Sequence, residues 1–252
     1  MRAILRKIAG RISNSARESR AKLFRDLFDL NKGTSVLDLG SQDGKHVARI
    51  LQGTEVEPQN VSVADLDLTT LQAIEKKFGY KPVPIGEDGK LPLDDGSVDI
   101  VFCSSVIEHV TIDKDEVWSV TDGEEFRGRS FTRQKAFADE IRRVGRGYFV
   151  QTPNRYFPIE SHTWLPFAGF LPRRMLISAI KFANRFWVFY SVPDFNLLDK
   201  NDLARLFPDA ELIFEKRFGL IKSIMAVKTE KHIGKKTEIR PQENSRRRPH
   251  DA

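Results

Sequence analysis

Short apolar runs alternate with amphipathic stretches along most of this chain. Runs with β-rich composition predict strands at 35–39, 61–64, 81–85, 98–103 and 148–152. Apolar residues at helical spacing predict helices between them at 45–51, 69–77 and 131–144. Strands and helices that alternate in this way predict an α/β fold with a parallel sheet covered on both faces. Pro82 and Pro84 place the third run at a sheet edge, because each removes a ladder donor.

The later part of the chain departs from this alternation. Residues 154–200 are rich in aromatic residues and proline, which predicts an insertion over one end of the sheet. Asn201 is placed to cap a short helix that ends at Leu206. The alternating runs 211–218 and 221–228 are joined by a tight turn, so these two strands must be antiparallel.

Basic residues are concentrated at the two ends of the chain. Residues 1–33 carry nine Lys or Arg against three acidic residues, and residues 229–252 carry seven against four. We predict a basic amphipathic helix at 1–30, the main domain at 31–228 and a disordered basic tail at 229–252. Such ends suit solubility or contact with an anionic surface better than a nucleic-acid groove.

The number of cysteines limits which disulfides and metal sites are possible. Cys103 is the only cysteine, which excludes an internal disulfide framework and a cysteine cluster for zinc. We therefore expect a reducing, cytoplasmic location and no metal site. Neither a secretory signal nor a span of sufficient hydrophobic length is recognised.

A glycine-containing turn follows the first predicted strand, in the run Val36-Leu37-Asp38-Leu39-Gly40-Ser41-Gln42-Asp43-Gly44. Parallel α/β sheets bind ligands at the carboxyl ends of their strands. The turn lacks the three-glycine fingerprint that accepts the pyrophosphate of a dinucleotide. Its carboxylate, Asp38, opposes a phosphate and attracts a cation. S-adenosylmethionine carries an ammonium and a sulfonium and no phosphate, so it fits this turn better than NAD.

A second carboxylate, Asp65, stands at the end of the second predicted strand. A carboxylate in this place can accept hydrogen bonds from both hydroxyls of a ribose. It can equally cap the following helix, and Asp67 is close enough to be mistaken for it. With the glycine turn before it, we predict that Asp65 binds ribose.

These features resemble class I S-adenosylmethionine-dependent methyltransferases, in particular the methyltransferase type 11 group. Val36–Gly44 is similar to the first family motif, with Gln42 where a central glycine is usual, and Val63-Ala64-Asp65 is similar to the second. The later motifs are matched by 87–93, 97–102, 106–110 and 144–147. Within the family the resemblance is to the broad group related to quinone-biosynthesis methyltransferases, and a looser similarity is to methyltransferases of bacterial polysaccharide loci.

The resemblance implies a Rossmann-like, mostly parallel sheet of seven strands whose last strand is antiparallel. It also implies the cofactor, S-adenosyl-L-methionine. The implied cofactor-binding residues are Asp38, Gly40, Ser41, Gly44, Asp65, Leu66, Glu87, Asp88 and Ser104. In this set Glu87 is favoured over Asp88 for the adenine amino group.

The candidates for catalysis are His109, Glu160 and His162. A hydroxyl nucleophile usually needs a base, and His109 follows the fourth predicted strand closely enough to face the methyl group. As an alternative, His109 only fixes the start of a helix. Glu160 and His162 follow the fifth strand, where this fold normally places acceptor-binding residues. Polar groups flanked by aromatics there suit a ring-bearing ligand such as a sugar.

Several functions and partners remain open at this stage. We predict methyl transfer to a hydroxyl of a small molecule or glycan, with a quinone or other lipid as the rival acceptor. Aromatic and basic residues interleave at 165–190, which predicts a lid or, alternatively, peripheral membrane contact. A protein that binds S-adenosylmethionine without catalysis is a third reading. Nucleic-acid methylation is disfavoured because no Asn/Asp-Pro-Pro-Tyr/Phe motif is present.

Overall fold

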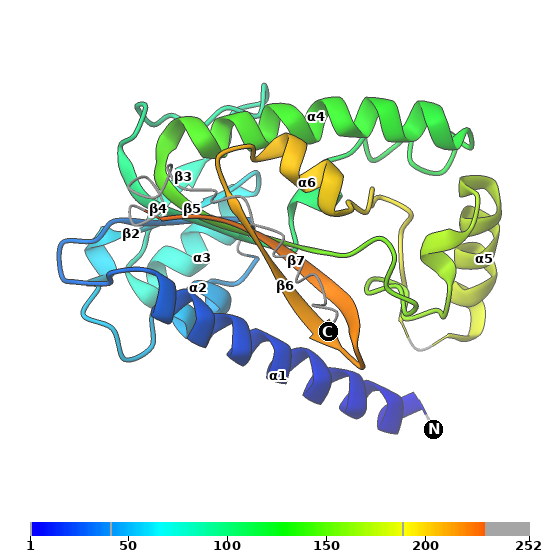
Figure 1. Ribbon diagram of the computed structural model, residues 1–252. Coiled ribbons are helices and arrows are strands. Elements are labelled where there is room, and N and C mark those ends of the chain that lie inside the picture. Colours follow the sequence, from blue (N-terminus) through cyan, green and yellow to red (C-terminus); the bar gives the residue numbers. More distant parts are fainter. Residues whose placement is uncertain (1, 41, 188, 230–252) are drawn as a thin grey trace, which may run out of the picture.

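The computed structural model describes residues 2–40, 42–187 and 189–229, which form one mixed sheet with helices on both faces (Figure 1). The strands are β1 (Val36–Leu39), β2 (Val61–Asp65), β3 (Lys81–Pro84), β4 (Val98–Ser104), β5 (Gly145–Pro153), β6 (Glu211–Arg217) and β7 (Leu220–Lys228). Their order across the sheet is β3-β2-β1-β4-β5-β7-β6. Strands β1 to β5 pair in parallel, whereas β7 is antiparallel to both β5 and β6. The predicted Rossmann-like sheet is confirmed, with β3 at an edge.

Helices cover both faces of this sheet. They are α1 (Arg2–Leu27), α2 (Lys45–Ile50), α3 (Leu68–Phe78), α4 (Gly123–Val144), α5 (Arg173–Phe186) and α6 (Lys200–Leu206), with single 3-10 turns η1 (Pro58–Asn60), η2 (Ile107–His109) and η3 (Ala168–Phe170). Figure 1 shows α1, α2 and α3 on one face, α4 and α6 on the other, and α5 to one side of the sheet. Both faces of the parallel strands are therefore shielded from water, as their apolar composition requires.

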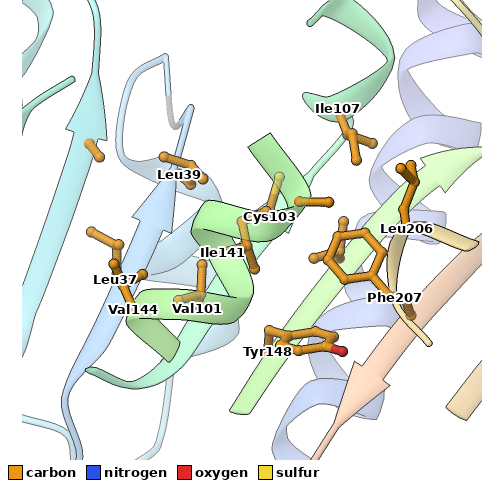
Figure 2. Packing of buried hydrophobic residues seen from close by; sticks show 14 of the residues in the cluster. Leu37, Leu39, Val101, Cys103, Ile107, Ile141, Val144, Tyr148, Leu206 and Phe207 are labelled. Atoms are coloured by element: carbon orange, nitrogen blue, oxygen red, sulfur yellow. The ribbon is translucent and has the colours of Figure 1, made fainter. Parts of the chain in front are cut away.

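Two hydrophobic clusters fill the space between the sheet and its helices. Figure 2 shows the cluster under α4 and α6, where Ile141 and Val144 of α4 lie near Val101 of β4. Leu206 and Phe207 close the same cluster from the α6 side. Each of these side chains is almost completely buried, which stabilises the fold by about 1.5–3 kcal/mol per large apolar side chain.

The basic helix α1 packs on the sheet through its last turns. Phe24 is fully buried, and its ring centroid lies 5.5 Å from that of Phe102 and 5.7 Å from that of Phe149. Within the segment 1–30, for which a helix is predicted, the structure has α1 at Arg2–Leu27. The predicted tail at 229–252 lies outside the described residues from position 230 onward.

Three elements differ from their sequence-based predictions. Helix α4 begins at Gly123 instead of residue 131, because Asp122 accepts hydrogen bonds from the N–H groups of Glu124 and Glu125 and caps an earlier turn. Helix α5 was not predicted within the insertion. Asn201 is not the cap of α6, since Asp199 accepts from the Asn201 N–H group and starts the helix.

Candidate active site

A cavity of about 560 Å³ opens at the carboxyl ends of β1, β4 and β5. It is lined by the end of β1, the end of β4, the turn η2, the insertion after β5, helices α1 and α2 and the β6–β7 hairpin. Six of the predicted site residues line it together: Asp38, Gly40, Ser104, His109, Glu160 and His162. The fold therefore joins the predicted cofactor end and the predicted acceptor end in one space.

The turn after β1 has residues in the left-handed backbone conformation that glycine favours. The φ angles are 79° at Gly40, 55° at Gln42 and 71° at Gly44. Gln42 thus adopts the shape expected of the glycine that it replaces, at a cost in strain of about 1–2 kcal/mol. Ser41, a predicted cofactor contact, lies outside the described residues.

The two glycines of this turn are also required by packing within the protein. A Cβ atom on Gly40 would lie 2.7 Å from a methyl group of Val106, and one on Gly44 would lie 3.0 Å from Ile74 and Phe78. The turn is therefore held tightly between α3 and the segment after β4. This crowding explains the small residues without reference to a ligand.

The donor set at this end suits S-adenosylmethionine. Asp38 is 2% exposed at the end of β1 and lines the cavity, so its carboxylate can meet the ammonium group of the cofactor. Ser104 lines the same wall, where its hydroxyl donates to Gln151 Oε1 at 2.6 Å. These two side chains suit a cation better than a phosphate.

Two aspartates near the carboxyl end of β2 have different contacts. Asp67, and not Asp65, caps α3, because its carboxylate accepts from the Thr69 N–H group at 3.0 Å and from the Thr70 hydroxyl at 2.6 Å. Asp65 is thereby left at the end of β2, where it accepts a local bond from the Asp67 N–H group at 3.1 Å. This geometry keeps Asp65 available for the ribose contact that we predict.

The remaining predicted cofactor residues lie outside the lining of the cavity. They are Gly44, Asp65, Leu66, Glu87 and Asp88. Leu66 is 70% exposed at the end of β2, and Asp88 accepts from the Lys90 N–H group within its own turn. Their cofactor contacts stay predictions.

The acceptor end of the cavity holds a cluster of carboxylates and imidazoles that extends from buried glutamates to the exposed ring of His109. Glu108 is fully buried, and its Oε2 accepts from the Thr152 hydroxyl at 3.0 Å. His162 lies between two glutamates, with Nδ1 2.7 Å from Glu160 Oε1 and Nε2 3.6 Å from Glu108 Oε1. The His109 ring packs edge-to-face on the His162 ring at 4.6 Å, and its Nδ1 lies 3.3 Å from Asp194 Oδ1. The three predicted catalytic residues therefore form one unit.

The charges within this cluster depend on each other. Burial disfavours a charge on His162, but Glu108 and Glu160 outweigh it and raise the pKa of His162 to about 10. Burial raises the pKa of Glu160, but the bonds to His162 and Thr163 outweigh it and lower that pKa below its usual value. Each ring nitrogen of His162 faces a carboxylate. The geometry therefore does not assign His162 as the only base.

A second group of charges lines the wall formed by α1 and α2. Arg17, Arg20 and Arg49 lie there with His46. Burial and the three nearby guanidinium groups lower the pKa of His46 to about 4. Sequence reasoning missed this wall, because the basic residues of 1–33 were interpreted as serving solubility or contact with an anionic surface.

Glu108 and Asp194 were also missed by sequence reasoning. Glu108 stands next to His109 in the segment after β4, so its neighbour was a signal that it lies at the site. Asp194 belongs to the irregular end of the insertion, and no local pattern marks it. Asp194 lies beside His109 because the chain after α5 returns to the segment that follows β4.

Comparison with known proteins agrees with this geometry. Residues 37–121 match the family model described as a methyltransferase domain. An uncharacterized methyltransferase of Schizosaccharomyces pombe is 32% identical over 78 residues, which are 31% of this chain and 30% of that relative. The chain therefore spans less than a third of the length of the curated relative that it matches.

Solved structures share the fold. Loganic acid methyltransferase with S-adenosylhomocysteine has a TM-score of 0.50 and 13% identity, covering 81% of this chain and 72% of the other. A SAM-dependent methyltransferase from Aquifex aeolicus has a TM-score of 0.43 and 14% identity, covering 84% and 88%. The chain thus shares the fold of a solved methyltransferase, and its residues 37–121 match a methyltransferase domain.

Proposed function

We propose that this protein transfers the methyl group of S-adenosylmethionine to a hydroxyl group of a small molecule or glycan. One observation carries the proposal: a single cavity joins the β1 end, with Asp38 and Gly40, to the cluster of His109, Glu160 and His162. Methyl transfer is an in-line displacement, so the nucleophile and the methyl group must be held close together and aligned. A shared cavity of this size meets that requirement.

The cluster of carboxylates and imidazoles favours a hydroxyl as the acceptor group. A hydroxyl must lose its proton as it attacks, whereas a neutral amine can attack without prior activation. Three carboxylates and two imidazoles converge at the acceptor end: Glu108, His109, Glu160, His162 and Asp194. The arginine wall on α1 and α2 further favours an acceptor that carries negative charge.

A transfer assay and calorimetry test this function together. We expect S-adenosylmethionine and its demethylated product to bind, and labelled methyl to appear on hydroxyl-bearing glycans or small molecules. The panel of acceptors includes quinols, other lipids and amines. Tight binding of NAD without binding of the other two would refute the cofactor assignment, and methyl transfer only to amines would refute the acceptor class. Cofactor binding with no transfer to any acceptor would favour a non-catalytic binding protein.

A lipid or quinone acceptor is the second candidate, and an exposed aromatic surface favours it. Large apolar side chains around α5 are at least 37% exposed: Phe167, Phe170, Met175, Phe182, Phe186, Trp187 and Tyr190. Trp164 lines the cavity and stacks on Phe189 at 5.6 Å, which connects this surface to the site. No helix in the described part of the chain is both long and apolar enough to cross a membrane. Transfer to quinols, and not to glycans, in the same panel would select this candidate.

A further inference from the structure

We propose that Glu108, His109 and His162 bind a divalent transition-metal ion, which in turn contacts the acceptor hydroxyl. One donor atom from each residue lies within 4.8 Å of the other two. The inference rests on the proposed function for its chemical role, but the binding of the metal itself is independent of cofactor and acceptor. It replaces the expectation, based on cysteine content, that the chain has no metal site.

The carboxylate of Glu108 is the first argument. Its Oε1 is buried and has no hydrogen-bond partner among the described residues. It lies 3.6 Å from His162 Nε2, which is too long for a hydrogen bond. Two ligand atoms that each lie about 2.1 Å from a tetrahedral ion are about 3.4 Å apart. The gap between Oε1 and Nε2 therefore suits a shared ion better than a direct bond.

The second argument is the orientation of the two imidazoles. His162 directs Nδ1 to Glu160 at 2.7 Å, and His109 directs Nδ1 to Asp194 at 3.3 Å. His109 therefore leaves its Nε2 atom for a metal, and Nε2 of His162 faces Glu108 Oε1 across the 3.6 Å gap in which the proposed ion would lie. Histidine ligands of metals commonly donate their other N–H group to a carboxylate, which fixes the tautomer and the ring direction. Phe195, stacked on the His162 ring at 4.7 Å, holds that ring further.

The ligand types indicate which ions fit. Two imidazoles and one carboxylate suit Zn²⁺, Fe²⁺ or Mn²⁺, whereas Mg²⁺ and Ca²⁺ prefer sites built from oxygen ligands. Three protein ligands leave coordination positions open, as in catalytic metal sites. His109 and His162 both line the cavity, so these open positions face the space where the acceptor is proposed to bind.

The proposed chemistry balances without a further reactant. A bound cation would lower the pKa of the acceptor hydroxyl that it contacts, and the hydroxyl proton would be released to solvent. The oxygen lone pair then forms a bond to the methyl carbon. The carbon–sulfur bond breaks and its electron pair returns to sulfur, which becomes a neutral thioether. The products are the methyl ether, S-adenosylhomocysteine and one proton.

Metal binding by the full-length chain tests the inference. After treatment with a chelator and its removal, Zn²⁺ or Mn²⁺ is titrated in a calorimeter without cofactor or acceptor. We expect one ion per chain and much weaker binding of Mg²⁺. Glu108→Gln and His162→Gln are each expected to weaken binding at least tenfold, and Glu160→Gln about 10–100-fold. His46→Gln, which alters a histidine of the same cavity outside the cluster, is the matched control and is expected to retain the affinity.

The outcomes separate this inference from the proposed function. Binding that is no tighter than millimolar, or that survives both Glu108→Gln and His162→Gln, overturns the metal site. Circular dichroism and cofactor binding establish that each variant is folded. Methyl transfer that is unchanged in the chelator-treated enzyme overturns the catalytic role of the ion while it upholds the methyltransferase. Loss of transfer that Mn²⁺ or Zn²⁺ restores supports both.

Discussion

Two aspartates at the end of β2 show how position decides the role of a residue. Asp65 and Asp67 are two residues apart and chemically identical. Asp67 accepts hydrogen bonds from the first turn of α3 and so stabilises the helix. Asp65 is the last residue of β2, at the edge of the sheet where parallel strands bind ligands. One residue therefore serves the fold, and we predict that the other serves the cofactor.

Alanine variants at these two positions form a matched pair. We expect Asp65→Ala to weaken S-adenosylmethionine binding about 10–100-fold, because hydrogen bonds to a charged group contribute about 1.5–3 kcal/mol. Asp67→Ala is expected to lower the free energy of unfolding by about 1 kcal/mol and to retain cofactor affinity. Calorimetry and urea denaturation measure the two effects. Equal affinity in the Asp65→Ala variant and the native chain would remove the ribose assignment.

At the scale of elements, helix α1 combines a structural and a site-forming role. Its last turns place Phe24 in the cluster between the helices and the sheet. Its middle turns place Arg17 and Arg20 on the cavity wall, and Arg20 pairs with Glu215 of β6 at 2.9 Å. The apolar face of these last turns is therefore occupied by the sheet. Among the described surfaces, the exposed aromatics around α5 fit membrane contact better.

The buried ring of Phe24 provides a test of how α1 is attached. We expect Phe24→Ala to lower the free energy of unfolding by about 3–5 kcal/mol, because the loss leaves a cavity among three aromatic rings. Phe182→Ala, at a ring that is 65% exposed on α5, is expected to change it by less than about 0.5 kcal/mol. Urea denaturation compares the two variants. Similar stabilities would show that α1 is not part of the cooperative core.

At the scale of the whole molecule, the insertion is fastened to the domain by a buried arginine. Arg173, at the start of α5, donates to the carbonyl groups of Val117 and Val120 at 2.7 Å and of Pro193 at 3.3 Å. Its guanidinium lies over the Phe126 ring of α4, 3.2 Å from the centroid. Burial lowers the pKa of Arg173 to about 10, so the group remains charged at neutral pH. This residue links the insertion to the segment between β4 and α4.

Replacement of this arginine is expected to loosen the insertion. Arg173→Met removes the donor of three carbonyl groups, two of which belong to buried residues, and we expect a loss of about 3–5 kcal/mol in the free energy of unfolding. Arg174→Met, at the exposed neighbouring position, is expected to be nearly neutral. Limited proteolysis within residues 154–199 reports on the same change. Unaltered stability and proteolysis in Arg173→Met would show that other contacts hold the insertion.

Much of the fold was predictable because its signals are local. The apolar runs of β1 to β5, the prolines of β3 and the short turn before β7 each depend on neighbours in sequence. The start of α4 was placed too late, because its first two turns are mostly polar and are stabilised by the Asp122 cap and by burial of Phe126. Helix α5 was missed since its apolar residues face two environments, one buried and one exposed.

By itself the sequence determined the order of the strands and of every helix except α5, the glycine turn with Asp38, and the candidates at positions 109, 160 and 162. Periodicity, turn chemistry and residue type are properties of short segments, so they can be read without a structure. Only the tertiary structure decided that Glu108 meets His162, that Asp194 meets His109 and that α1 closes the cavity. These contacts join segments far apart in the chain, and packing of the sheet and the insertion brings them together.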